Sequence, residues 1–152
     1  MYDWNRKIDW SKQLYFEDVE VGSEVPPVSI PIDLQRLVME AGANRDFSSI
    51  HHDRDLAQAS GAPDAFASTT FIMGMFERTL REWMGLQGSI KKLGPFRMMI
   101  FMSVGDVVTF KAIVKNKQKE DGKGIIDLEI WAESPKGQTV KGAAIVILPI
   151  KD

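Results

Sequence analysis

The most regular pattern of hydrophobic positions lies in residues 67–84 and predicts the main helix of the protein. Apolar residues recur there at helical spacing and form one stripe, whereas charged residues occupy the opposite side. The stripe contains Phe71, Ile72, Met75, Phe76, Leu80 and Trp83, and the polar side contains Glu77, Arg78, Arg81 and Glu82. Gly85 ends the predicted helix. Gly74 within it costs about 1 kcal/mol relative to alanine, which suggests close packing at that point.

Four later segments alternate between apolar and polar residues and are predicted to be strands. They span residues 90–102, 106–117, 124–133 and 139–148. Two turn-forming sequences, Asp121–Lys123 and Pro135–Gly137, join the last three strands as hairpins. The last strand is apolar on both faces, as a covered central strand would be.

One long helix followed by an antiparallel meander predicts an α+β fold. A sheet with one apolar face must cover that face, and wrapping the sheet around the helix is a compact solution. This arrangement is the hot-dog fold. The chain has 152 residues, the usual size of one domain, so we expect a single domain over residues 1–152.

The first half of the chain is less regular. Residues 1–27 are expected to form a surface lead-in with one short strand, ending at Pro26-Pro27. A short helix is predicted over 33–41, with Asp33 as its N-cap. Residues 44–66 are polar and rich in turn formers, which indicates irregular structure with a short helix near 54–59. A loop of this length inside a compact domain is uncommon unless it has a function.

Composition excludes several classes of protein. The net charge of −2 and the pI near 5.7 lack the basic character of a nucleic-acid binder. The absence of cysteine excludes disulfides, thiolate metal sites and cysteine nucleophiles. The longest apolar run, Ala143–Leu148, is far shorter than the ~20 residues that span a membrane. We therefore expect a cytoplasmic protein that binds neither nucleic acid nor membrane. The basic residues Lys91, Lys92 and Arg97 could meet ligand phosphates, although a solvated strand face is the simpler interpretation.

The loop over residues 44–55 concentrates the side chains able to do acid–base chemistry. It holds both histidines of the chain, His51 and His52, together with several carboxylates. Histidine suits a general base because its ordinary pKa is ~6.5, and a carboxylate in a partly dry site suits a general acid. Asp46 and His51 are five residues apart, so an irregular loop can bring both onto one water molecule. Two alternatives remain open from spacing alone: a solvated structural loop, and a Zn²⁺ site, although adjacent histidines rarely point at one centre.

The segment Asp46–His51 resembles the signature Gly-Asp-Phe-Asn-Pro-(Leu/Ile)-His of MaoC-like and (R)-specific enoyl-CoA hydratases. Leu14–Gly22 resembles the family's opening, and Val104–Thr109 resembles its Val-Gly-Asp strand start. The resemblance implies a hot-dog fold and addition of water to a trans-2-enoyl-CoA, giving an (R)-3-hydroxyacyl-CoA, or the reverse dehydration. It implies that Asp46 and His51 are catalytic, with His51 activating water and Asp46 protonating C2. It implies no metal and no other cofactor.

Three places depart from the family pattern. Arg45 replaces the glycine before the aspartate, and Ser48-Ser49 replaces Asn-Pro. At the start of the central helix Ser68 and Thr69 replace His-Gly, whose glycine N–H polarises the thioester in the family. A threonine still supplies an N–H at a helix N-terminus, where the dipole favours a developing negative charge. We therefore expect Ser49, Ser68 and Thr69 to bind substrate. The alternative for Ser68 and Thr69 is ordinary helix capping.

The run Arg45–Asp55 also resembles hydratase subunits of steroid side-chain degradation, in which a catalytic hot dog pairs with one that lacks the Asp/His pair. Because this chain keeps the pair, it would be the catalytic partner. The small residues Ala65, Ala67 and Ser68 would leave space for a bulky acyl group. A lone hot dog leaves its sheet edges open, so we expect a homodimer or a heteromer with another hot-dog subunit, with the acyl-CoA tunnel at the interface.

Two other functions remain open. A hot-dog thioesterase usually places a carboxylate on the central helix facing the thioester, but Glu77 and Glu82 lie on the polar side of the predicted helix. A non-catalytic assembly subunit is the third interpretation, because of the departures from the family pattern.

Overall fold

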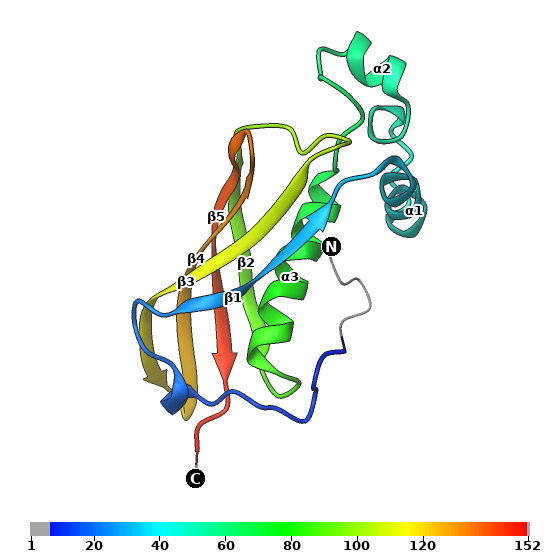
Figure 1. The fold of residues 1–152 in the computed structure, drawn as a ribbon. Helices are drawn as coiled ribbons and strands as arrows, with labels where there is room; N and C mark the ends of the chain where they lie inside the picture. The colour runs from blue at the N-terminus through cyan, green and yellow to red at the C-terminus, as the bar shows by residue number, and fades with distance from the viewer. Residues whose placement is uncertain (1–6, 152) are drawn as a thin grey trace.

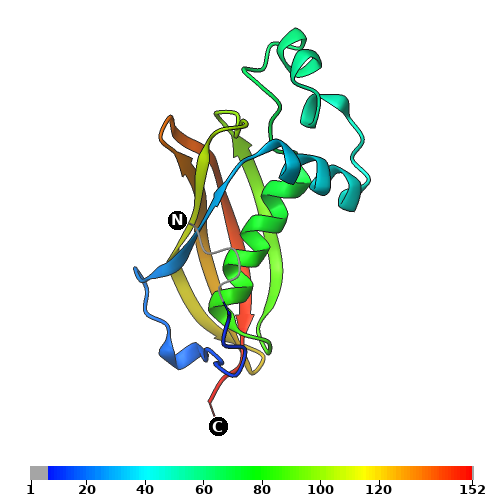
Figure 2. The same cartoon turned by 45° about the vertical axis from the view of Figure 1, so that its right-hand side comes forward.

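A five-stranded antiparallel sheet curves around one long helix (Figures 1 and 2). In this computed structural model, which describes residues 7–151, the strand order is β1-β3-β4-β5-β2. The elements are β1 (Glu24–Pro31), α3 (Thr69–Met84), β2 (Ser89–Met98), β3 (Val107–Glu120), β4 (Lys123–Ser134) and β5 (Gly137–Leu148). The predicted α+β hot-dog arrangement, a long helix wrapped by an antiparallel sheet, is confirmed.

Helix α3 begins two residues later than the predicted residue 67, directly after its N-cap Ser68, and ends before Gly85 as predicted. The Ser68 hydroxyl accepts a hydrogen bond from the Phe71 N–H at 3.1 Å, which satisfies one of the free donors of the first turn. Gly85 follows the last helical residue with a φ of 78°, a conformation that favours glycine. The two caps therefore determine where the helix, and with it the apolar stripe, starts and stops.

The stripe of α3 packs on the concave face of the sheet. Phe76 stacks on Phe96, with 5.5 Å between ring centroids, and meets Phe110 edge-on at 5.1 Å. Burying one such ring completely stabilises the fold by roughly 1.5–3 kcal/mol. One prediction about this helix is wrong. Among the described residues, no atom outside the neighbouring backbone of the helix lies within 4 Å of a Cβ built on Gly74, so close packing against other elements of the chain does not explain that glycine.

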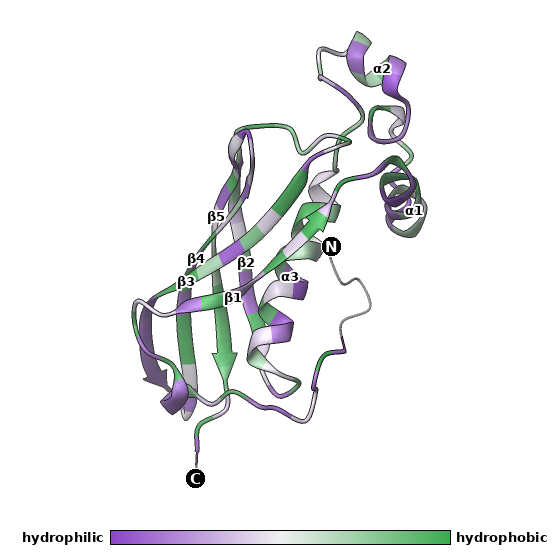
Figure 3. Cartoon of the chain, viewed as in Figure 1, coloured by the Kyte–Doolittle hydropathy of each residue, from purple (hydrophilic) through white to green (hydrophobic). Residues whose placement is uncertain are grey.

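The two predicted hairpin turns are present. Asp121 and Gly122, with φ of 48° and 73°, form the turn between β3 and β4. Two consecutive positive φ values are those of a type I′ turn, whose twist matches that of the strands it joins. Pro135-Lys136 joins β4 to β5. Figure 3 shows the resulting mixture of apolar and polar residues along the strands.

Strand β5 lies inside the sheet, between β4 and β2, as expected of a central strand. Its inward residues Ala144, Val146 and Leu148 are buried. Its outward residues Ile145 and Ile147 are only half-buried, so within residues 7–151 the outer face is not fully covered. The apolar residues on both faces of this strand therefore correctly predicted that it lies inside the sheet. They did not predict a second layer of the chain that covers the outer face of the strand.

The N-terminal strand differs from the prediction. Residues 1–6 lie outside the described part of the chain, and β1 continues to Pro31 instead of ending at Pro26-Pro27. Proline is tolerated here because β1 is an edge strand and its pairing with β3 is interrupted by a bulge between Val25 and Val28. The lead-in also reaches the core, because Phe16 and Val19 are buried.

Strand β2 ends at Met98, earlier than predicted. The N–H groups of Met99 and Ile100 both approach the carbonyl of Thr139, and the chain then leaves the sheet. Ser103 forms an isolated bridge with Phe66, just before α3. Residues 99–101 thus lie beside the start of the central helix, and their apolar side chains remain exposed.

The segment between β1 and α3 projects beyond one end of the sheet, beside the N-terminal end of α3 (Figures 1 and 2). It contains α1 (Leu34–Asn44), the 3-10 turn η2 (Ser49–His51) and α2 (Arg54–Ala59). The short helix near 54–59 is confirmed, and α1 is longer than the predicted 33–41. This projecting segment carries both histidines.

Candidate active site

Asp46 is placed by the way α1 ends. Arg45 adopts a left-handed conformation, with φ of 56° and ψ of 29°, and reverses the chain direction. The Asp46 N–H then donates to the Ala41 carbonyl at 3.0 Å, and the Arg45 N–H donates to that of Gly42 at 3.4 Å. These are the two bonds of a Schellman motif. The motif holds the Asp46 backbone against the end of α1 and leaves its carboxylate about one-third exposed.

His51 is oriented by one hydrogen bond on its inner side. The ring is buried, 8% exposed, and its Nδ1 lies 2.9 Å from the Phe66 carbonyl oxygen. Because a carbonyl can only accept, Nδ1 must carry the hydrogen. The neutral imidazole then has its lone pair on Nε2. The Phe66 ring meets the imidazole edge-on at 5.1 Å and limits its rotation.

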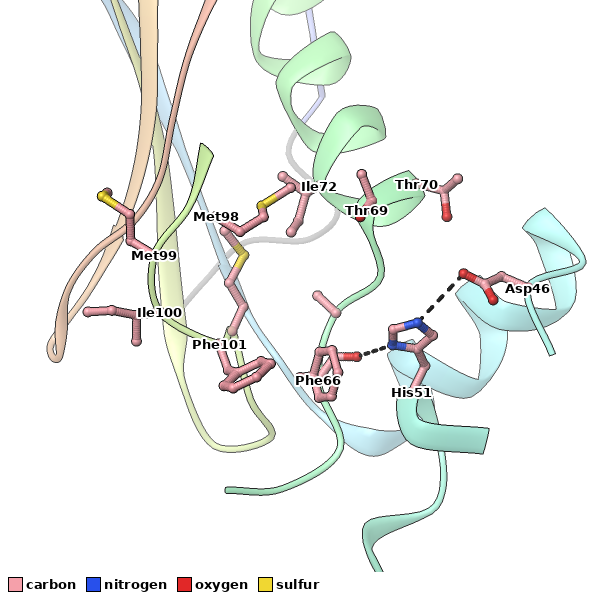
Figure 4. A pocket seen from close by; sticks show the side chains of 12 residues that line it. Asp46, His51, Phe66, Thr69, Thr70, Ile72, Met98, Met99, Ile100 and Phe101 are labelled. Atoms are coloured by element: carbon pink, nitrogen blue, oxygen red, sulfur yellow. Dashed lines mark hydrogen bonds and ion pairs between the residues drawn. The ribbon is translucent and has the colours of Figure 1, made fainter. Parts of the chain in front are cut away.

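Asp46 and His51 face each other across one wall of a cavity (Figure 4). The distance from His51 Nε2 to Asp46 Oδ2 is 3.7 Å. This is too long for a direct hydrogen bond but suits two groups that share one water molecule. The structure therefore brings together the two residues that the sequence singles out.

The cavity has a volume of about 330 Å³ and lies between the projecting segment, the start of α3 and the end of β2. It is lined by Asp46, His51, Phe66, Ala67, Thr69, Thr70, Ile72 and the run Met98–Met102. Its polar groups gather on one side, and methionine and aromatic side chains form the other (Figure 4). Such a wall can adapt to apolar groups of different shape, because methionine is unbranched and flexible.

The N-terminal turn of α3 forms part of the cavity wall and carries free backbone donors. Thr69 and Thr70 both line it, and their backbone N–H groups have no acceptor among residues 7–151. Free N–H groups at a helix N-terminus favour a negative charge. Ser68, 1% exposed, and Ser49 do not lie in the cavity wall, so of the three expected substrate contacts only Thr69 lines it.

Glu40 is a polar residue of this region that belongs to no sequence motif. Its side chain is 9% exposed, and its Oε1 accepts hydrogen bonds from Asn44 Nδ2 at 2.6 Å, Ser68 Oγ at 2.7 Å and Thr70 Oγ1 at 3.1 Å. Its Oε2 is buried without a partner among the described residues. The only available signal was helical spacing, which puts Glu40 on the same face of α1 as Leu37 and Ala41.

The charged residues after His51 have structural roles. Asp53 caps α2 by accepting a hydrogen bond from the Leu56 N–H at 3.1 Å. Arg54 pairs with Asp64 through two nitrogens, and its guanidinium lowers the pKa of the Asp64 carboxyl. His52 is half-buried and does not line the cavity. The two adjacent histidines are thus clearly distinguished by the fold.

The remaining candidates lie away from the cavity. Glu77 and Glu82 of α3 pair with Arg81 and Arg78, at 3.7 and 2.7 Å, and neither lines the cavity. Within residues 7–151 no group of three or more histidine and acidic side chains is arranged to hold a metal ion. None of the helices in that range combines the length and apolar character needed to cross a membrane.

Comparison with known proteins finds relatives along most of the chain, although no protein-family model matches it. The chain is 31% identical over 132 residues to the 3-oxo-4,17-pregnadiene-20-carboxyl-CoA hydratase beta subunit of Mycobacterium tuberculosis, covering 87% of this chain and 97% of the relative. The fold matches a chain of the ChsH1–ChsH2 complex from M. tuberculosis with a TM-score of 0.76, at 29% identity over 85% of this chain and 98% of that one. It also matches the (R)-hydratase from A. caviae involved in PHA biosynthesis, with a TM-score of 0.78, at 21% identity over 88% and 99% of the two chains.

Proposed function

Because this chain belongs to the MaoC-like and (R)-specific hydratase family, we propose that it is the catalytic subunit of an enoyl-CoA hydratase. It would add water to a trans-2-enoyl-CoA to give a 3-hydroxyacyl-CoA, or catalyse the reverse dehydration. One observation carries the proposal. The hydrogen bond between His51 Nδ1 and the Phe66 carbonyl leaves a basic Nε2 that faces Asp46 inside the cavity.

The geometry supports a balanced sequence of proton transfers. His51 Nε2 takes one proton from water, and the hydroxide oxygen bonds to C3 of the enoyl group. The double-bond electrons move toward the thioester oxygen, where the free N–H of Thr69 is suited to hold the developing negative charge. Asp46, the proposed acid, gives a proton to C2. The proton on His51 then returns to Asp46 through a water molecule that both groups share, since their 3.7 Å separation is too long for direct transfer, and both groups are restored.

We propose an acyl group that is bulky and apolar. The relative from M. tuberculosis is named for a pregnadiene carboxyl-CoA, which is a polycyclic acyl thioester. The flexible Met98–Met102 side of the cavity is compatible with such a group, and Ala67 adds little bulk to the wall.

We further propose that the chain works in a heteromer with a second hot-dog subunit. The relative is named a beta subunit, and one structural match comes from a two-protein complex. Of the two sheet edges, β1 carries Pro26, Pro27 and Pro31, which lack N–H donors. The β2 edge is the better one for pairing, and the exposed apolar run Met98–Phe101 continues from its end. A partner on this edge would cover that run and the cavity beside it.

The charge on β2 favours a different partner over a second copy. Lys91, Lys92 and Arg97 are exposed, and none of them forms an ion pair within residues 7–151. Antiparallel pairing of β2 with a second copy would place these cations on neighbouring strands, and like charges close together across two strands are destabilising. We therefore expect the partner strand to carry acidic residues. Native mass spectrometry at low and high salt tests this, and a tight homodimer at low salt would contradict it.

Hydration is tested with crotonyl-CoA and a ring-bearing enoyl-CoA, using the protein alone and co-expressed with candidate hot-dog subunits. Loss of enoyl absorbance reports hydration, and release of free thiol reports a thioesterase. We expect Asp46→Asn and His51→Gln each to lower hydration by about 10²–10⁴-fold, the usual contribution of an acid–base group. The matched control is His52→Gln, which lies outside the cavity wall and should keep the activity.

The melting temperature of each variant shows that the fold persists. If either cavity variant keeps near-normal turnover, the assigned roles are wrong. If the wild type is inactive in every assembly tested, the chain is an assembly subunit and not the catalytic one.

A further inference from the structure

We propose that the Thr70 hydroxyl, in the cavity wall, accepts a hydrogen bond from the bound ligand. We propose also that buried Glu40 is a positioning residue, which fixes the orientation of that hydroxyl. The identity of the ligand rests on the proposed hydratase function. The orientation of the hydroxyl follows from contacts within the chain. Neither residue belongs to the Asp46–His51 pair, and the wall residue Thr70 lies next to Thr69, whose N–H is proposed to serve the thioester.

The direction of the Thr70 hydroxyl follows from counting hydrogens. A carboxylate only accepts, so Ser68 Oγ donates its single hydrogen to Glu40 Oε1 at 2.7 Å, while it accepts from the Phe71 N–H. Thr70 Oγ1 lies 2.7 Å from Ser68 Oγ and 3.1 Å from Glu40 Oε1. In the bond to Glu40 the Thr70 hydroxyl is the donor, so its one hydrogen is directed at Glu40 Oε1, away from the cavity. What Thr70 can offer to the cavity is its free lone pairs.

Glu40 holds this arrangement rigidly. It is 9% exposed, and its Oε1 also accepts from Asn44 at the last residue of α1. Glu40 therefore ties the end of α1, which places Asp46, to the first turn of α3, which places Thr70. The Thr70 hydroxyl donates its hydrogen to a carboxylate, and this makes its oxygen a stronger acceptor, because hydrogen bonds in a chain polarise one another.

Burying a carboxylate at this position has an energetic cost. Glu40 Oε2 is buried and has no hydrogen-bond partner among the described residues. Leaving a buried acceptor without a partner costs about 1–3 kcal/mol. An apolar residue would avoid that cost, but it would leave Asn44, Ser68 and Thr70 without the acceptor they share. The carboxylate is better explained by what it does to the hydroxyls of Ser68 and Thr70.

The reaction supplies a hydrogen that needs such an acceptor. When His51 takes one hydrogen of the attacking water, the other stays on the oxygen and becomes the 3-hydroxyl hydrogen of the product. Asp46 and Thr70 line the same side of the cavity. In Figure 4 the oxygen of Thr70 points toward the region between Asp46 and His51. We assign Thr70 as the acceptor of that remaining hydrogen, which leaves Asp46 free to protonate C2.

Binding measurements test this without requiring turnover. Titration calorimetry of the purified assembly compares 3-hydroxybutyryl-CoA with butyryl-CoA, which differ by the hydroxyl. The wild type should prefer the hydroxylated ligand, and Thr70→Val should lose about three- to tenfold of that preference, the usual value of one hydrogen bond. Thr70→Ser should restore it. Thr109→Val is the matched control, because it removes a hydroxyl contact to Ser29 on the sheet, outside the cavity wall.

Glu40 is tested in the same assay. Glu40→Leu should reduce the preference as Thr70→Val does, and should lower kcat for hydration more than it changes KM. Glu40→Gln keeps an acceptor oxygen and should retain most of both, which also covers the case in which Glu40→Leu does not fold.

The outcomes separate the two proposals. If Thr70→Val keeps the full preference for the hydroxylated ligand, Thr70 is not the acceptor. If Glu40→Gln and Glu40→Leu change only the melting temperature, Glu40 is merely structural. A preference that depends on Thr70 in a protein that hydrates nothing would refute the proposed function and leave this inference standing.

Discussion

Replacing Arg45 by glycine should stabilise the protein, although it removes a large side chain next to the catalytic candidate Asp46. Arg45 has a φ of 56° and a ψ of 29°, in the left-handed region that only glycine adopts without a steric cost. The side chain is exposed, and it forms no hydrogen bond or ion pair within residues 7–151. The two Schellman bonds involve only main-chain atoms, so glycine can form both.

The magnitude follows from two opposing effects. The left-handed conformation costs an L-residue with a Cβ roughly 1–2 kcal/mol, which glycine avoids. Glycine also makes the unfolded chain more flexible, which takes back about 0.4–1 kcal/mol. The net effect is a gain of about 0.5–1 kcal/mol in the free energy of unfolding. For a chain of this length, it should raise the melting temperature by about 1–4 °C.

Urea denaturation and thermal scans of Arg45→Gly beside Arg45→Ala measure the effect. Alanine removes the same charge and most of the same bulk but keeps a Cβ, so we expect little change from it. If both variants gain equally, the charge of Arg45 is the cause and the backbone argument is refuted. If Arg45→Gly is less stable than the wild type, the Schellman turn does not have the geometry described here. Hydration activity should be unchanged in either variant, because neither alters the position of Asp46.

Two further predictions concern the sheet and its N-terminal lead-in. Gly142→Ala should lower the free energy of unfolding by about 1–3 kcal/mol in urea titrations, because its Cβ would lie 2.8 Å from the Pro95 carbonyl oxygen. If Gly142→Ala is as stable as the wild type, β2 can shift away from the added Cβ without cost. The hydrogen bond from Lys119 lowers the pKa of Glu17 from 4.5 to about 2, so its contribution is present above pH 4.5 and lost as the pH falls toward 2. The difference in melting temperature between the wild type and Glu17→Gln should therefore shrink over that interval, and a constant difference would contradict the ion pair.

Several parts of the fold were predictable because their signals are local. The N-caps Asp33 and Ser68 act within three residues of their own position, so the starts of α1 and α3 follow from neighbouring residues. The Asp121-Gly122 turn is determined in the same way, by the ability of these residues to adopt positive φ. The pairing of Asp46 with His51 was also predictable, but only through the resemblance to a family, since spacing alone left other interpretations open.

Other features depend on contacts between residues far apart in the sequence. Pro26-Pro27 was expected to end a segment but lies inside β1, because only the strand order shows that β1 is an edge. The cavity wall at Met98–Phe101 exists because Ser103 bridges to Phe66 and carries the chain past the start of α3. No local pattern contains these pairings.

The same reason explains what the sequence determined about the chemistry and what it left to the fold. The sequence supplied an imidazole and a carboxylate on one loop. The tertiary structure decided which ring nitrogen of His51 is basic, because the deciding acceptor, the Phe66 carbonyl, is 15 residues away. It also decided that Glu40 meets the hydroxyls of Ser68 and Thr70, which lie 2.7 and 3.1 Å from its Oε1 but 28 and 30 residues away in the chain. Residue type sets which bonds a group can make, but only packing sets which partner is within reach.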